Sequence, residues 1–343
     1  MLSLKLFAGV LLSRFVIALS FFVVSVHLGA DSAFAENFRK SVRWKNIRLQ
    51  IQFIGELNKD NDREYFSGPF GVSLGIDNRI YVADDLAHRV LVFDKNRKLA
   101  ETIGKKGTRP GDFAWLDAAT MDIEGKLYVA DTGNDRVQIL DRNRVVLKHF
   151  GRRGEKPGFF KNPRGIALDR KNRVYVADWG NHRVQIFDEK GRFLSSLGHL
   201  GKKESEFDGP ICLFIDRDEL IYVCDFKNHR IQVFDKSGTF VRVFGRFGRG
   251  VGELQNPSGI TGDKFGNMYV ADYSNHRLQI FRSDGEYVGE FGSFGNQFGS
   301  FNNPTSAAIS GTGELYVVDK GNRRVQIFRV VREEVKSSSN DPR

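Results

Sequence analysis

Cysteine, proline and helical periodicity are all scarce in this sequence. Two cysteines and eight prolines occur among 343 residues, against 36 glycines. There is no Cys-x-x-Cys pair, and no cysteine follows directly on the N-terminal apolar segment, which argues against a lipid-anchored form. No Gly-rich phosphate-binding motif is present, and no stretch repeats its apolar residues with a helical period. Abundant glycine with little proline suits a chain of many tight turns.

The first 35 residues have the features of a targeting segment. Lys5 and Arg14 precede an apolar stretch, Phe15–Val26, and Ala33-Phe34-Ala35 then offers a small-x-small cleavage site. An apolar core of this length is typical of a secretory signal and short for a membrane span. We therefore predict a signal peptide over residues 1–35, with an uncleaved membrane anchor as the alternative. The mature chain would be secreted or periplasmic, and an anchored chain would face the extracytoplasmic side.

One motif, Tyr-Val-x-Asp followed five residues later by Arg, recurs six times at a constant spacing. Its aspartates are Asp84, Asp131, Asp178, Asp225, Asp272 and Asp319, each 47 residues after the one before. Within one period, short apolar runs alternate with turn residues such as Asp169–Asn172 and Asp188–Gly191. Four antiparallel strands per 47 residues make one blade of a β-propeller. The sequence thus predicts an all-β, six-bladed propeller over residues 36–331.

The two ends of the repeat region predict how the ring closes. The last repeat supplies three strands and ends near Val330, whereas Asn46–Gly55 resembles the fourth strand of the other blades. We expect this N-terminal strand to join the last blade, so that the ring has no open edge. The polar residues 332–343 are predicted to form a disordered tail.

The repeats resemble NHL repeats, a family named for an Asn-His-Leu triplet, with Asn-His-Arg in its place in three copies here. The resemblance covers about Gly68 to Phe328 and implies a six-bladed propeller. Family members include RNA-binding translational repressors, protein-interaction modules and a related amidating lyase that uses a metal. The resemblance therefore implies the fold and leaves the activity open.

The repeated aspartates and arginines are predicted to be structural. An aspartate at a strand end can accept hydrogen bonds from turn amides, and an arginine can pair with a carboxylate while its stem packs. One substrate needs one asymmetric site, so a feature present in all six blades indicates architecture. We expect function where the copies differ.

The copies differ most on the side that carries the turns after the aspartates and the connections between blades. The connection Gly151–Arg164 has a net charge of +4, and Trp179, Phe226 and Tyr273 follow the aspartate in three successive repeats. Such rings beside cations can bind bases or sugars that carry anionic groups; alternatively, they only cover the ends of neighbouring strands. The candidate ligand-binding residues are Arg152, Arg153, Lys156, Arg164, Trp179, His182, Phe226, His229, Tyr273 and His276.

Cys212 and Cys224 fall in one repeat, on two expected strands joined by the turn Asp216–Glu219. Two cysteines facing each other across such a hairpin are candidates for a disulfide in an exported protein. The alternative is a pair of buried thiols.

These features favour a non-catalytic binding or scaffold module for another protein or for an anionic polymer such as a glycan. No catalytic residue, metal ligand or cofactor is predicted, since His182, His229 and His276 on adjacent blades should lie too far apart to share a zinc ion.

One alternative is a metal-dependent lyase or lactonase-like enzyme with its site in the central channel. Against it, the strand starts 162–169, 209–216 and 256–263 lack the histidines that the amidating lyase implies. Binding of single-stranded RNA is an alternative if residues 1–35 are not an export signal, and a membrane is a partner only if that segment stays uncleaved.

Overall fold

Each Tyr-Val-x-Asp motif lies in a strand, and its four residues are all buried. Tyr81 packs in an apolar cluster with Leu116 and Val129 of the next repeat. Val82, which points to the other side of the same strand, packs with Val318 and Val325 of the last repeat. Side chains alternate across a strand, so burial on both sides means that every sheet is covered by two others. The core therefore consists of apolar layers between neighbouring sheets.

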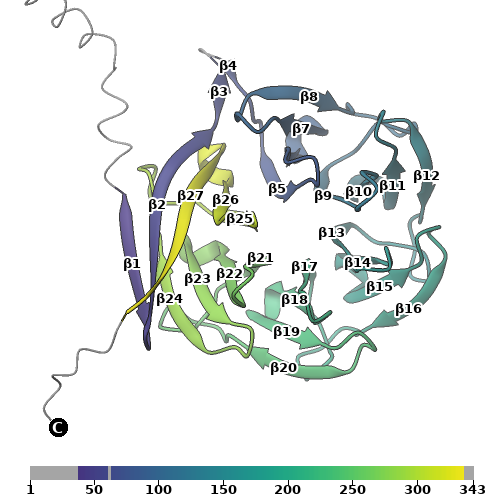
Figure 1. Cartoon of the computed structure of the whole chain (residues 1–343). Helices are drawn as coiled ribbons and strands as arrows, with labels where there is room; N and C mark the ends of the chain where they lie inside the picture. The colour runs from purple at the N-terminus through teal and green to yellow at the C-terminus, as the bar shows by residue number, and fades with distance from the viewer. Residues whose placement is uncertain (1–37, 61–62, 336–343) are drawn as a thin grey trace, which may run out of the picture. The chain divides into compact units, whose positions relative to one another are not determined.

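The computed structural model describes residues 38–60 and 63–335, and within them six sheets form a ring (Figure 1). The strands of the first three blades are β5 (Pro69–Leu74), β6 (Ile80–Asp84), β7 (Arg89–Phe93), β8 (Leu99–Ile103), β9 (Leu116–Met121), β10 (Leu127–Asp131), β11 (Arg136–Leu140), β12 (Val146–Phe150), β13 (Pro163–Leu168), β14 (Val174–Asp178), β15 (Arg183–Phe187) and β16 (Phe193–Leu197). Blades 4 and 5 contain β17 (Pro210–Ile215), β18 (Ile221–Asp225), β19 (Arg230–Phe234), β20 (Phe240–Phe244), β21 (Pro257–Gly262), β22 (Asn267–Asp272), β23 (Arg277–Arg282) and β24 (Tyr287–Phe291). Blade 6 contains β25 (Pro304–Ile309), β26 (Glu314–Asp319), β27 (Arg324–Glu334), β2 (Ile47–Leu57) and β1 (Arg39–Trp44). The two-residue strands β3 (Lys59–Asp60) and β4 (Arg63–Glu64) form a separate short hairpin.

A single-turn 3₁₀ helix joins the second and third strands of every blade. The six turns are η1 (Asp85–Ala87), η2 (Thr132–Asn134), η3 (Trp179–Asn181), η4 (Phe226–Asn228), η5 (Tyr273–Asn275) and η6 (Lys320–Asn322). In a four-strand meander these turns lie on the same side as the connections between blades. We call this side the connection face, and the side with the other turns the opposite face.

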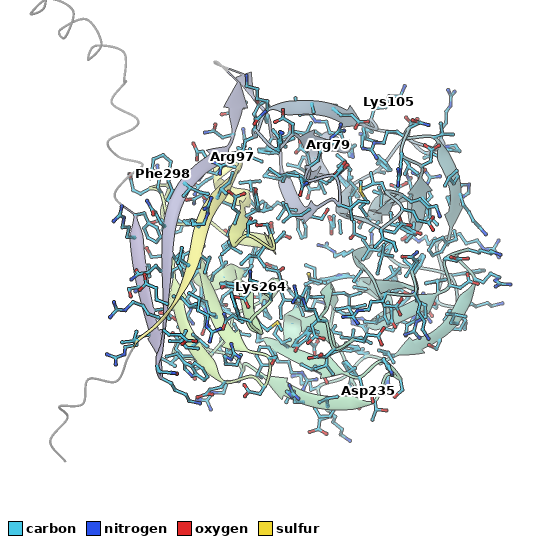
Figure 2. The ribbon with its side chains drawn as sticks, in the orientation of Figure 1. Arg79, Arg97, Lys105, Asp235, Lys264 and Phe298 are labelled. Carbon is cyan, nitrogen blue, oxygen red and sulfur yellow. The ribbon has the colours of Figure 1, made fainter. Side chains whose placement is uncertain are left out.

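The N-terminal strand closes the ring, as predicted. β2 pairs antiparallel with β27 from Ile47 to Leu57. It is also held by blades on either side, because Arg97 Nη1 donates to the Ile54 carbonyl at 2.8 Å and Phe298 stacks on Phe53 at 4.2 Å. Figure 2 shows Arg97 and Phe298 beside this strand. Both ends of the repeat region therefore share one sheet.

Two features of this sheet differ from the prediction. A fifth strand, β1, pairs with the outer edge of β2, and its Val42 packs so closely against β24 that a Cβ on Gly289 would overlap it. β27 also continues through Glu334, three residues beyond the predicted end of the propeller at residue 331. β2 and β27 are 11 residues long each and pair with each other along most of this length.

The predicted signal peptide, residues 1–35, and most of the predicted tail, residues 336–343, lie outside the described residues. Over residues 38–60 and 63–335, no helix is long and apolar enough to cross a membrane.

Candidate functional site

One buried aspartate organises the connection face of each blade. Asp178 is fully buried; its Oδ1 accepts the Lys161 N–H at 2.7 Å and its Oδ2 accepts from Arg183 Nε at 2.9 Å. Arg183 Nη2 also donates to the Lys156 and Phe159 carbonyls, at 3.1 and 2.9 Å. The same ion pair recurs as Asp84–Arg89, Asp131–Arg136, Asp225–Arg230, Asp272–Arg277 and Asp319–Arg324. The prediction that these repeated residues are structural is confirmed.

The three candidate histidines connect neighbouring blades. Each follows a 3₁₀ turn with a left-handed φ, and its Nδ1 accepts a backbone N–H from the next connection. Because Nδ1 accepts in His229 and His276, the proton of each neutral ring resides on Nε2. Burial lowers the pKa of His229 and His276, which also favours the neutral ring. The bonds join His182 to Gly209, His229 to Asn256 and His276 to Asn303, at 3.2, 3.0 and 3.1 Å; His88 binds Trp115 in the same way at 3.0 Å. Each of these histidines therefore links its own blade to the connection that leads into the next blade. Ligand binding by the three histidines stays a prediction.

The three candidate aromatic side chains form one continuous row. The Trp179 and Phe226 ring centroids lie 5.4 Å apart, and those of Phe226 and Tyr273 lie 6.0 Å apart. The Arg164 guanidinium lies over the Trp179 ring at 4.5 Å, and Lys227 Nζ approaches the same ring at 5.4 Å. All three rings are partly buried and start successive 3₁₀ turns. Cations therefore flank one end of an aromatic row on the connection face.

The basic connection between β12 and β13 lies against the turn that starts at Trp179. Asn181 Nδ2 donates to the Gly154 carbonyl at 2.8 Å, which fixes the connection to η3. Arg152, Arg153 and Lys156 are exposed. The structure therefore brings these three cations next to the blade that carries the first ring of the row.

Arg164 differs from the other candidate cations because it pairs with Asp117 at the mouth of the central channel. Its Nη1 lies 3.2 Å from Asp117 Oδ2, and the Asp117 side chain is only 6% exposed. Burial raises the pKa of Asp117 to about 6, although Arg164 opposes this shift. Asp117 is the extra residue of a β-bulge, since Leu116 and Ala118 pair with consecutive residues of β10. A bulge can re-aim a side chain in this way.

Sequence reasoning did not single out Asp117, although a signal was available. The second residue of each innermost strand is Phe70, Asp117, Arg164, Ile211, Ser258 and Thr305 in blades 1 to 6. Only Asp117 and Arg164 in this set carry charge. A second ion pair lies nearby, between Lys320 Nζ and Asp85 Oδ2 at 2.9 Å. The other carboxylate oxygen, Asp85 Oδ1, is buried and has no hydrogen-bond partner.

The innermost strands enclose a channel cavity of about 320 Å³ that Asp117 and Arg164 line. Ser73 also lines it, and its buried Oγ has no hydrogen-bond partner. Gly71 to Gly75 spell Gly-x-Ser-x-Gly, the letters of a nucleophile elbow. That motif requires a sharp strand-to-helix turn at the serine. Ser73 instead lies inside β5, so the pattern here is part of a strand.

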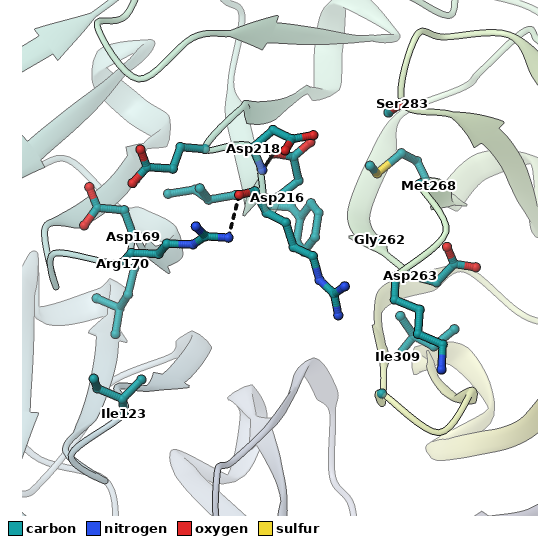
Figure 3. A pocket seen from close by; sticks show the side chains of 18 of the residues that line it. Ile123, Asp169, Arg170, Asp216, Asp218, Gly262, Asp263, Met268, Ser283 and Ile309 are labelled. Atoms are coloured by element: carbon teal, nitrogen blue, oxygen red, sulfur yellow. Dashed lines mark hydrogen bonds between the residues drawn. The ribbon is translucent and has the colours of Figure 1, made fainter.

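A second cavity, of about 460 Å³, opens at the other end of the channel (Figure 3). Its rim carries Asp169, Asp216 and Asp263, whose carboxylates accept tyrosine hydroxyls of the following strands. Arg170 Nη2 donates to the Arg217 carbonyl at 2.6 Å across the same rim. These acids hold strands together. Among residues 38–60 and 63–335, no group of three or more His, Cys, Asp or Glu side chains is arranged to hold a metal ion.

Exposed apolar side chains also lie on the connection face, and sequence reasoning missed them. Phe247 and Phe294 are 65% and 69% exposed, and their rings lie against His229 and His276 at 4.9 and 4.8 Å. The equivalent residues of two other connections are Lys106 and Arg153. The face therefore has a basic part and an apolar part.

Cys212 and Cys224 are directly opposite each other on β17 and β18. Their facing arrangement agrees with the expectation from the hairpin. Both are free thiols in this structure, and burial raises the pKa of Cys224 well above its ordinary value. The disulfide between them stays a prediction.

Comparison with known proteins agrees with this geometry. The NHL repeat family matches residues 160–187, 207–234, 254–281 and 301–328, and a family described as a 6-bladed beta-propeller matches residues 73–141. The chain is an NHL-repeat six-bladed β-propeller. Comparison with curated proteins gives no match.

Solved structures similar to this NHL-repeat propeller have varied activities. An auxiliary nutrient binding protein from Bacteroides thetaiotaomicron has 16% identity and a TM-score of 0.62, covering 85% of this chain and 77% of its own. A gluconolactonase from Xanthomonas campestris has 13% identity and a TM-score of 0.61, covering 88% and 93%. Virginiamycin B lyase from Staphylococcus aureus has 12% identity and a TM-score of 0.54, covering 82% and 100%. At such identities the likeness shows the fold alone.

Proposed function

We propose that this NHL-repeat propeller is exported and acts as a non-catalytic binding module for a partner that carries negative charge, either a protein or an anionic polymer such as a glycan. The observation that carries the proposal is the continuous row of Trp179, Phe226 and Tyr273 beside the exposed connection with Arg152, Arg153 and Lys156. Rings supply contact area at low entropic cost, and exposed cations attract a partner of opposite charge.

Asymmetry around the ring supports this location. The equivalent positions in the other three blades are Asp85, Thr132 and Lys320, so the row spans only half of the mouth. Equivalent positions in a repeat protein have similar structural roles. A residue type that occurs in only some of the repeats is therefore a better candidate for ligand binding than one that occurs in all of them.

A polyanion-binding assay tests the proposal. We expect the triple variant Arg152→Ala/Arg153→Ala/Lys156→Ala to elute from immobilised heparin, a sulfated glycan, and from immobilised polyglutamate at lower salt than the unchanged protein, because it has lost cations that release counterions on binding. Trp179→Ala should weaken binding with a smaller change in salt dependence.

The matched control removes three exposed lysines from the opposite face, Lys95→Ala/Lys98→Ala/Lys190→Ala. Both triple variants lose the same net charge. If both lower the elution salt equally, or if the unchanged protein binds neither polyanion, the proposed site is wrong.

A further inference from the structure

Four charged side chains lie at the mouth of the central channel, and three of them have a buried polar atom without a hydrogen-bond partner. Asp117 Oδ2 and Arg164 Nε are buried and have no hydrogen-bond partner, although the two side chains form an ion pair. Asp85 Oδ1 is also without a partner, while its Oδ2 binds Lys320. A buried polar atom without a partner costs about 1 to 3 kcal/mol. Asp117 and Arg164 also line the channel cavity, so a ligand there could supply the hydrogen bonds that these two side chains lack.

These side chains together carry no net charge. Asp85 and Asp117 balance Lys320 and Arg164, and each acid already contacts one cation. A charged ligand would disturb this balance. The unsatisfied groups of the two charged residues that line the cavity are one carboxylate oxygen of Asp117, which accepts hydrogen bonds, and the Arg164 Nε–H, which donates one. Hydroxyl groups match this set, because each one both donates and accepts.

The size and walls of the cavity also restrict the ligand. Its volume of about 320 Å³ is at the small end of the roughly 300 to 1,000 Å³ of ligand pockets. Phe70 forms an apolar wall on the Asp117 side, and Lys320 lies over its ring at 4.5 Å. Ser73 adds a further unpartnered hydroxyl deeper in the channel.

We propose that the channel mouth, through Asp117 and Arg164, binds a small neutral polyhydroxylated molecule of about the size of a monosaccharide. This site goes beyond the proposed binding of an anionic partner, because it lies inside the channel and does not use the exposed connection 151–160. The ligand's hydroxyls donate to Asp117 Oδ2 and accept from Arg164 Nε. Asp117 must be ionised for both of its carboxylate oxygens to accept hydrogen bonds. The charged groups that face it are Arg164, Asp85 and Lys320.

A series of sugar probes that differ at one substituent, and thereby in charge, tests this inference. Glucose, glucosamine and glucuronate share a six-membered sugar ring and are neutral, cationic and anionic. We expect ligand-observed NMR on the whole protein to show tightest binding for glucose, weakening as the pH falls below about 6. Tighter binding of glucuronate or glucosamine, or binding of none of the three, would overturn the inference.

Two amide substitutions locate the site. Asp117→Asn keeps the side-chain shape and should weaken glucose binding about tenfold or more, since a hydrogen bond to a charged group is lost. Asp218→Asn makes the same change in the cavity at the other end of the channel and should leave binding unchanged. Arg164→Gln, made as a separate variant, should also weaken glucose binding. It tests the site independently if Asp117→Asn fails to fold. Loss of binding in Asp218→Asn alone would place the site at the other end and overturn the inference. None of these assays uses a polyanion, so their failure is distinct from failure of the heparin test.

Discussion

Asp117 and Asp178 show how differently two buried carboxylates serve the same fold. Asp178 accepts hydrogen bonds from Lys161, Asn181 and Arg183 and has a counterpart in every blade. Asp117 has no counterpart and leaves Oδ2 without a hydrogen bond. A residue that is kept at a cost in stability is a functional candidate. Repeated side chains thus build this propeller, and the exceptions mark its sites.

Asp117 should lower the stability of the folded protein at neutral pH. Its pKa rises from 3.8 in the unfolded chain to about 6 when folded, so the folded protein holds this proton more tightly. The ionised group therefore disfavours folding above about pH 6, and the penalty disappears as the pH falls toward 4. We predict that Asp117→Asn raises the free energy of unfolding by up to about 3 kcal/mol near pH 7.5 and by almost nothing near pH 4.

Urea unfolding of both proteins at several pH values measures this difference. A variant that is less stable than the unchanged protein near pH 7.5 would show that Asp117 is structural.

The aromatic row was predictable from the sequence, whereas the channel mouth was predictable only in part, through the two charges among the second residues of the innermost strands. Trp179, Phe226 and Tyr273 recur at the repeat interval, so the regular ring places them side by side. The pairing of Asp117 with Arg164 depends on a bulge and on burial, which the repeat pattern does not reveal. The joining role of His182 was missed for a similar reason, because its partner lies in the next connection.

Among the strands, the closing strand β2 was predictable and the outermost strand β1 was not. β2 alternates buried Leu49, Ile51 and Phe53 with partly exposed residues, as expected for a strand with one covered face. β1 has one buried side chain, Val42, and its other residues are polar or partly exposed. Its position depends on the small size of Gly289 on β24, a long-range contact that no local pattern encodes.

Closure by β2 should dominate the stability of the ring. We predict that Leu57→Asp lowers the free energy of unfolding by more than about 3 kcal/mol, because Leu57 is buried in an apolar cluster opposite Val325, where a charge would have no partner. Gln52→Asp on the same strand is the control, since its cross-strand neighbours are Arg39 and Arg329, and it should change stability by less than about 0.5 kcal/mol. Thermal and urea unfolding provide the comparison. Equal stability of the two variants would mean that β2 does not hold the ring closed.

Across the molecule, the two faces of the ring differ in what they offer a partner. The connection face carries the aromatic row, the basic connection 151–160 and the exposed Phe247 and Phe294. The acids of the opposite face that bind tyrosine hydroxyls are used to join strands. The fold followed from a 47-residue period, whereas the partner depends on a few side chains that break it. The low identity of structurally similar lyase, lactonase and binding proteins agrees with this separation of fold from function.

Hydrogen–deuterium exchange of the whole protein, with and without heparin, tests directly whether the connection face binds the partner. We predict slower exchange in residues 151–160 and in the turn 179–182 when heparin is present, because bound polymer shields these amides. Protection confined to the turns of the opposite face, such as Asp94–Lys98, would contradict it.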